Sequence, residues 1–205
     1  MVTHTFVNID LIEAEYLADL DGIEYDLTST ISLCEELKKV IENEDYASTM
    51  IDTLSTTISV RYSRPFASGV RKKIDIKNIA TIPEELIQEH ERILAIRNKY
   101  VAHSVNAFEE SQVVGYYIKE CPKEKGITSV SVQHGRVMGF TYRDAESIIK
   151  IATLVLRYVN DEITKERAKI LRLVREIDVM DFLNSASKKV PMLSSSDPRK
   201  KRNRR

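Results

Sequence analysis

Apolar residues recur at intervals of three and four along most of this chain, which is the spacing of one face of an α-helix. The clearest run has its apolar positions at Ala47, Met50, Ile51, Leu54, Ile58 and Tyr62. Asp21-Gly22 and Pro65 interrupt the pattern, and Pro83 fits the first turn of a later helix. The pattern predicts helices over residues 8–20, 26–43, 45–63, 84–103 and 143–186.

The segment before the last predicted helix has a different pattern. Residues 111–120 are rich in β-branched and aromatic side chains. Two more runs of this kind, 127–133 and 136–142, flank His134-Gly135, which suits a two-residue hairpin turn. We therefore expect a mainly α fold, an up-down helical bundle with a small antiparallel β insertion at about 111–141, before the last long helix.

Charge is unevenly distributed, although the formal net charge is zero. Residues 1–60 carry a net charge of −11, residues 61–188 carry +5, and residues 189–205 carry +6. We expect one helical domain over residues 1–188, followed by a basic disordered tail over 189–205. The basic rear half favours an anionic partner, although an ordinary charged surface gives the same distribution.

Composition excludes several classes of protein. Of the 205 residues, 42% are hydrophobic and 30% are charged, as in soluble globular proteins. No apolar run approaches the roughly 18 residues that indicate a membrane span, and the N-terminus does not resemble a signal peptide. Cys34 and Cys121 show no metal or disulfide spacing. We expect a cytoplasmic protein that does not associate with a membrane.

Cofactor and metal motifs are also missing from the sequence. "HERIL", from His90 to Leu94, begins like a zinc-binding HExxH motif but lacks the second histidine. No glycine-rich phosphate loop, nucleophile elbow or dinucleotide fingerprint is present. We therefore expect chemistry without a metal or a cofactor.

The predicted helix over 84–103 places ionisable residues on its apolar face. Arg97 follows His90 by seven residues, so both side chains point nearly the same way, among Ile93 and its apolar neighbours. A buried arginine cannot lose its charge and needs an anionic partner. That partner could be a core carboxylate, a subunit interface or a bound anion. His103 diverges from Arg97 by about 120° on a straight helix, but a twofold dimer would bring two such sets into one groove.

The run "RNKYVAHS" resembles the signature of the HEPN superfamily, which is an arginine, a polar residue, a few further residues and a histidine. Here these are Arg97, Asn98, the four residues from 99 to 102, and His103. The resemblance implies a homodimeric, metal-independent endoribonuclease that acts as a toxin or in antiphage defence, with an antitoxin or another protein as a further partner. The β insertion is not part of the minimal four-helix core of that family.

The resemblance also implies roles for three residues. His103 would be the general acid/base, Arg97 would stabilise the scissile phosphate, and Asn98 would orient the pair. A histidine titrates near neutrality and can move the proton of an RNA 2′-hydroxyl, and a guanidinium fits phosphate oxygens. The products would be a 2′,3′-cyclic phosphate and a 5′-hydroxyl, and DNA would resist cleavage.

Further cations are candidates for binding RNA. These are Lys99, His90, Arg61, Arg64 and Arg71. The alternative for the last three is a solvated loop, and for Arg97 it is a core ion pair in a helical adaptor. The alternative function is a non-catalytic HEPN-like module that binds RNA, a nucleotide or a protein.

Overall fold

The computed structural model describes residues 9, 11–43, 48–69, 71–98, 109–117, 127–136, 139–178 and 180. Its elements are α1 (Ala14–Glu42), α2 (Ser48–Ser63), the 3-10 turn η1 (Ile76–Asn78), α3 (Glu84–Ile96), β1 (Glu109–Tyr117), β2 (Ile127–Arg136) and α4 (Tyr142–Glu176). The expected fold class is confirmed: the chain is mainly helical, with a two-stranded antiparallel sheet before the last long helix.

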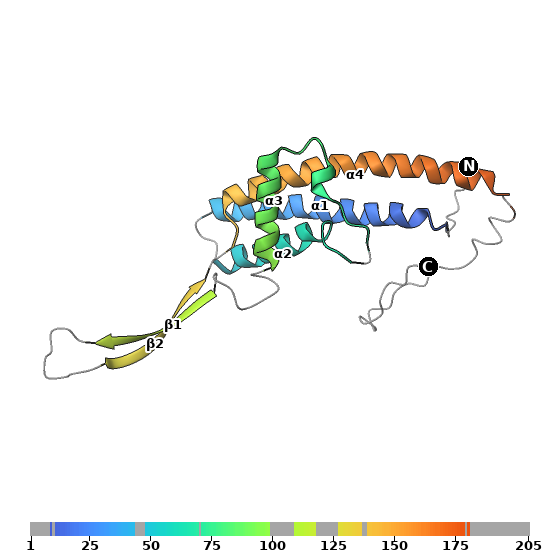
Figure 1. The fold of residues 1–205 in the computed structure, drawn as a ribbon. Coiled ribbons are helices and arrows are strands. Elements are labelled where there is room, and N and C mark those ends of the chain that lie inside the picture. Colours follow the sequence, from blue (N-terminus) through green and yellow to red (C-terminus); the bar gives the residue numbers. More distant parts are fainter. Residues whose placement is uncertain are drawn as a thin grey trace.

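Two long helices carry most of the packing. α1 and α4 lie side by side, α2 packs along α1, and α3 lies across α2 and α4 (Figure 1). The core between the helices is aliphatic, and its fully buried members include Leu20, Ile23, Leu27, Ile58, Ile93, Ile148, Ile151, Val155 and Val159. Since helices in proteins gain most of their stability from such packing, α1 and α4 depend on each other.

The N-terminal region differs from the expectation of two helices that end and begin around Asp21-Gly22. α1 runs through both residues without a break. The Cζ atom of Arg71 lies 2.9 Å from the position that a Cβ atom would take at Gly22. Gly22 therefore leaves room for a neighbouring side chain and does not end the helix, although glycine inside a helix costs about 1 kcal/mol relative to alanine.

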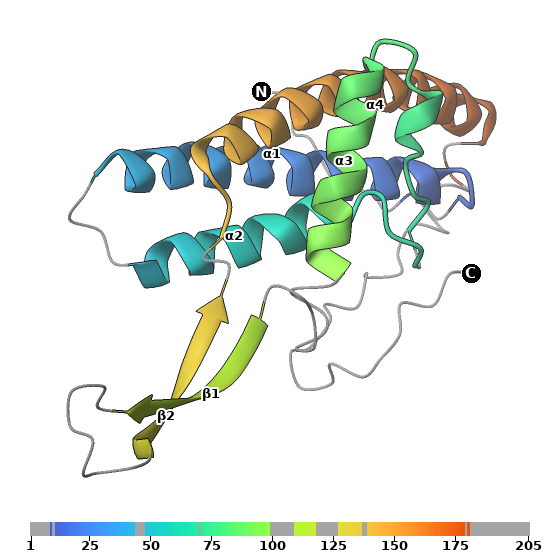
Figure 2. The same cartoon turned by 60° about the vertical axis from the view of Figure 1, so that its left-hand side comes forward.

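The β insertion is a hairpin that extends away from the helices (Figure 2). Its register pairs Val113 with Val132 and Ser111 with His134. The predicted turn at His134-Gly135 is therefore wrong, because both residues lie inside β2 and the connection between the strands spans 118–126, outside the described residues. Val113 and Val130 lie on the same face of the hairpin and are exposed.

The chain returns from the hairpin to the bundle through a tight contact with α2. Gly139 has φ 103°, a conformation that favours glycine, and the Phe140 N–H donates to Ser55 Oγ at 2.8 Å. Thr141 then caps α4: its hydroxyl oxygen accepts from the Asp144 N–H, and the Asp144 carboxylate accepts from the Thr141 N–H. α4 thus begins within one residue of the predicted start.

Helix ends differ from the predictions elsewhere. α4 ends at Glu176 and Ile177 is extended, whereas the pattern predicted helix to about residue 186. α3 ends at Ile96, with a wider π-type turn at residues 97–98. The predicted tail over 189–205 lies outside the described residues. In the part of the chain that the structure describes, no helix combines the length and apolar character that a membrane crossing needs.

Candidate functional site

The C-terminal end of α3 carries two residues of the predicted catalytic set. The Arg97 N–H donates to the carbonyl oxygens of Ile93 and Leu94, which keeps Arg97 in helical geometry. Its guanidinium donates from Nη1 to Asn98 Oδ1 at 2.9 Å. Arg97 is half-buried and Asn98 is exposed. His103 and Lys99, the other predicted members at this end, lie outside the described residues.

The Arg97 guanidinium is not neutralised by any carboxylate among the described residues. Its Nε atom is buried and has no hydrogen-bond partner there. Buried donors in folded proteins almost always find a partner, because an unpaired one loses its hydration without compensation. A core ion pair, which was the structural alternative for Arg97, is therefore absent from the described part of the chain.

His90, seven residues before Arg97, lies in the core and is only 4% exposed. Its Nδ1 and the Tyr62 hydroxyl form a hydrogen bond of 2.8 Å, and the Phe66 ring packs edge-on against it at 4.4 Å between centroids. Burial lowers the pKa of His90 to about 4. A buried, neutral imidazole offers RNA no charge at pH 7, so the prediction that His90 contacts RNA is corrected on that ground.

Three arginines predicted to bind RNA converge on one buried carboxylate. Asp26 of α1 is 1% exposed. Its Oδ1 accepts from Arg61 Nη1 at 3.1 Å and from Arg64 Nη1 at 3.0 Å, and its Oδ2 accepts from Arg71 Nη1 at 2.9 Å. We call these four residues the Asp26 cluster. The alternative of a loosely solvated loop does not describe these side chains, because each is held by a charge-assisted bond.

Local structure explains how the Asp26 cluster assembles. Arg61 lies in the last turn of α2, and Arg64 follows directly after the helix ends at Ser63. The Arg64 N–H donates to the Arg61 carbonyl oxygen at 3.4 Å, which continues the turn and keeps the two residues close. Arg71 comes from the connector after α2 and reaches Asp26 across Gly22, which lies one helical turn before Asp26 on α1. The Tyr25 ring lies 5.4 Å from the Arg61 guanidinium carbon and supports it by a cation–π contact.

Two backbone N–H groups near Arg71 hold the connector in place. The Ile74 N–H donates to the Pro65 carbonyl oxygen at 2.8 Å, which closes the loop. The Lys72 N–H donates to Oδ2 of the buried Asp19 at 2.9 Å, which fixes the loop to α1. These two hydrogen bonds therefore fix the backbone position from which the Arg71 side chain extends toward Asp26.

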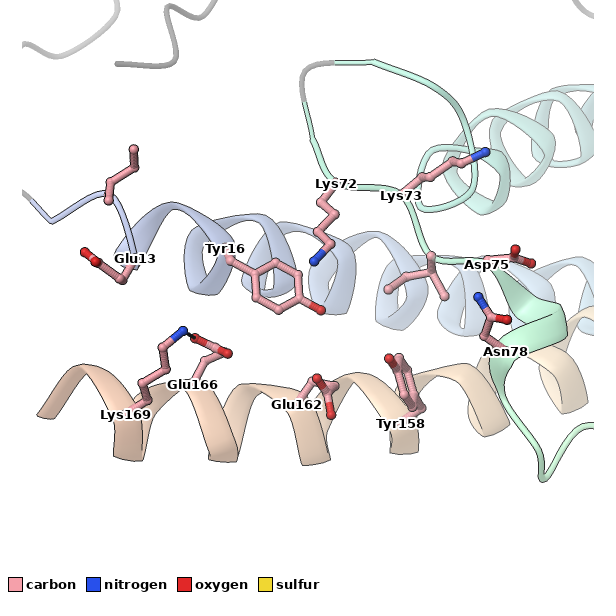
Figure 3. Close-up of a pocket in the computed structure, with 12 residues that line it drawn as sticks. Glu13, Tyr16, Lys72, Lys73, Asp75, Asn78, Tyr158, Glu162, Glu166 and Lys169 are labelled. Carbon is pink, nitrogen blue, oxygen red and sulfur yellow. Dashed lines mark hydrogen bonds and ion pairs between the residues drawn. The ribbon is translucent and has the colours of Figure 1, made fainter. Parts of the chain in front are cut away.

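A pocket of about 610 Å³ opens between α1, α4 and the same connector (Figure 3). Glu162 and Glu166 line it, and each pairs with a lysine three residues further along α4. Burial, with the nearby Tyr158 and these two carboxylates, raises the pKa of Tyr16. Lys72 lies over the Tyr16 ring at 4.2 Å. Four carboxylates and three lysines line this pocket, so charges of both signs nearly balance there.

The sequence did not indicate Asp26, Gly22 or Tyr25 as parts of a site. Asp26 lies 35 residues from Arg61 and 45 from Arg71 in the chain, so no motif spacing joins them. The sequence signal that could have indicated this site is Asp26 itself, an acidic residue on the buried face of a helix. Among the described residues no group of three or more histidine, cysteine or acidic side chains is arranged to hold a metal ion.

Both arrangements suit anions: an arginine at the end of α3 that no carboxylate of the described residues pairs with, and three arginines around one carboxylate of α1. Comparisons with protein-family models, with curated proteins and with solved structures found no match to this chain.

Proposed function

We propose that this protein is a metal-independent endoribonuclease of the HEPN type. The observation that carries the proposal is Arg97, a half-buried guanidinium at the end of a bundle helix that bonds to Asn98 and to no carboxylate in the described part of the chain. Its positive charge therefore has no carboxylate counter-ion in that part of the chain, which suits the binding of an anion. The run from Arg97 to His103 supplies the histidine that the resemblance implies.

The proposed reaction uses the RNA itself as the nucleophile. His103 accepts the proton of a 2′-hydroxyl, the 2′-oxygen bonds to the adjacent phosphorus, and the bond to the 5′-oxygen breaks. The leaving oxygen takes up a proton, and a 2′,3′-cyclic phosphate and a 5′-hydroxyl result. Arg97 stabilises the charge that develops on the phosphate oxygens, and Asn98 orients Arg97. A homodimer would place two such sets in one groove, so that one histidine acts as the base and the other as the acid.

In the cell, such an enzyme would act as a toxin or as an antiphage effector, and an antitoxin or another protein would restrain it. Slower bacterial growth on expression of the wild type, relieved by His103→Ala, supports this role. Equal growth of the two strains counts against it.

Digestion of RNA by purified variants tests the chemistry. The wild type should cut in the presence of a chelator and should leave DNA of the same sequence intact. His103→Ala and Arg97→Ala should each lower the rate by about 10²–10⁴. His134→Ala is the matched control, because it removes a histidine from the hairpin, and it should cut like the wild type.

Product ends and folding complete the test. Mapped ends should be a cyclic phosphate and a 5′-hydroxyl, and circular dichroism should show that each variant is folded. Equal cleavage by the wild type and His103→Ala, or cleavage abolished by the chelator, contradicts the proposal.

One observation favours a second candidate, a non-catalytic module that binds RNA or a nucleotide. The Asp26 cluster brings three arginines to one carboxylate, an arrangement that suits an anion and that consists of described residues only. RNA binding that is equal in the wild type and His103→Ala, with no cleavage by either protein, would establish this second function.

A further inference from the structure

The Asp26 cluster carries more positive charge than its buried carboxylate can neutralise. Arg61, Arg64 and Arg71 together supply three positive charges, and Asp26 supplies one negative charge. An arginine side chain in a protein stays protonated and keeps its positive charge. The cluster therefore keeps a surplus of two positive charges, concentrated around a single side chain.

Most hydrogen-bond donors of the three guanidinium groups have no partner among the residues that the structure describes. Each group has five N–H donors, and each donates one hydrogen bond, from Nη1, to Asp26. No other hydrogen bond of these side chains occurs among the described residues, where Arg61 also contacts the Tyr25 ring and Arg71 lies against Gly22. The arginine side chains are 32%, 45% and 30% exposed, in chain order, so water reaches them while Asp26 lies beneath.

The arginines are also held in place before any ligand arrives. Asp26 anchors all three, and the missing side chain of Gly22 lets the Arg71 guanidinium lie against α1. Side chains that are ordered in the free protein lose less conformational freedom on binding than flexible ones. An arriving anion also relieves the mutual repulsion of three like charges.

We propose that Arg61, Arg64 and Arg71 bind a dianionic phosphate group, with Asp26 as their fixed counter-ion. A phosphate monoester carries nearly two negative charges at neutral pH and three acceptor oxygens, which matches a surplus of two charges on three guanidinium groups. A phosphodiester within an RNA strand carries one charge. The site therefore distinguishes a terminal phosphate from an internal one, which deepens the RNA-binding role proposed above for these arginines.

Binding of an oligonucleotide with and without a terminal phosphate tests the proposal. The probe is a DNA hexamer with a 3′ fluorophore, either 5′-phosphorylated or 5′-hydroxylated, followed by anisotropy with the full chain. DNA lacks the 2′-hydroxyl that the proposed cleavage needs, so the readout does not depend on catalysis. We expect the phosphorylated hexamer to bind tighter by about tenfold or more, the effect of a hydrogen-bonded charge pair.

Substitutions locate the effect. Arg64→Gln removes the most exposed arginine of the cluster and should abolish most of the preference for the 5′-phosphate, and Arg61→Gln should do the same. Lys150→Gln is the matched control, because it removes one positive charge from an exposed position on α4 and should keep the preference. Arg64→Lys keeps the charge without the planar fork and should give an intermediate result.

A second measurement uses the wild type alone, so it does not depend on the folding of any variant. Inorganic phosphate and adenosine monophosphate should raise the thermal unfolding temperature of the wild type above its value in chloride of equal ionic strength. Equal shifts identify the phosphate group as the ligand, whichever molecule carries it. Lowering the pH below about 6, where the phosphate takes up a proton, should weaken the effect.

Two results would overturn the proposal. One is equal affinity of the wild type for the two hexamers together with no stabilisation by phosphate. The other is equal loss of the preference in Lys150→Gln and Arg64→Gln, which would show a general effect of charge. A failure of the ribonuclease assay leaves these results unchanged, so the two proposals fail separately.

Discussion

The buried pair of Tyr62 and His90 predicts a stability that falls in mild acid. Burial lowers the pKa of His90 to about 4, against 6.5 for a histidine in the unfolded chain. Between these pH values the unfolded state binds a proton that the folded state does not, so the free energy of unfolding decreases as the pH falls. The full contribution is present above pH 6.5.

The size of the effect follows from the two pKa values. A gap of about 2.5 pH units corresponds to about 3 kcal/mol. Linkage gives a loss of about 2 kcal/mol by pH 5 and about 3 kcal/mol by pH 4. In a protein of ordinary stability, 5–15 kcal/mol, this is a substantial share, and the urea midpoint should fall by about 1 M.

Urea unfolding at pH 7 and pH 5 measures this effect in the wild type and two variants. His90→Gln removes the titrating group. The loss of stability of this variant between pH 7 and pH 5 should therefore be smaller than that of the wild type by about 2 kcal/mol. Tyr62→Phe removes the hydroxyl but leaves the imidazole buried. It should lower stability by about 1–3 kcal/mol at both pH values and keep the pH dependence of the wild type.

An equal loss between pH 7 and pH 5 in the wild type and His90→Gln would refute the reasoning. That result would mean that the folded protein accepts a proton on His90 as readily as the unfolded chain does. The imidazole would then be within reach of water, and its exclusion from the RNA-binding residues would have no basis.

Three further predictions concern stability and are checked by urea or thermal unfolding. Asp26→Ala should lower the free energy of unfolding by about 3–5 kcal/mol, because three arginines lose their shared counter-ion, whereas Asp21→Ala, at an exposed position on the same helix, should change it by less than about 0.5 kcal/mol. Thr141→Ala should cost about 1 kcal/mol through loss of the cap of α4, and no change in its unfolding temperature would contradict the capping geometry. Gly22→Ala should not bring the stabilisation of about 1 kcal/mol that alanine gives inside a helix, because the new methyl group displaces Arg71; the full gain would show that this contact is not tight.

Periodicity predicted the helical elements well wherever a helix has one buried face. The α2 pattern and the start of α4 needed only local information, since spacing and capping residues act within a few positions. Asp21-Gly22 was misleading because its role is tertiary: Gly22 makes room for Arg71, which lies far along the chain. The hairpin turn was misplaced at His134-Gly135 because glycine, which is typical of two-residue turns, here lies inside strand β2.

The candidate sites show the same limit. Arg61, Arg64 and Arg71 were recognised as a basic group, but the carboxylate that organises them could not be found by spacing. His90 shares a helical face with Arg97, and only the packing of Tyr62 and Phe66 shows that this part of the face is closed to solvent. The same pattern of ionisable residues on an apolar stripe thus marks a buried hydrogen bond at His90. Two turns later, at Arg97, it marks a charge that no carboxylate of the described residues neutralises.

The pairing of α1 with α4 has a consequence for synthesis of the chain. About 100 residues separate the end of α1, Glu42, from the start of α4, Tyr142. At 5–20 residues per second a ribosome needs roughly 5–20 s to produce that interval. Throughout this time the apolar face around Leu20 and Leu27 lacks its main cover, so the nascent chain is most exposed to aggregation and to chaperones before α4 emerges.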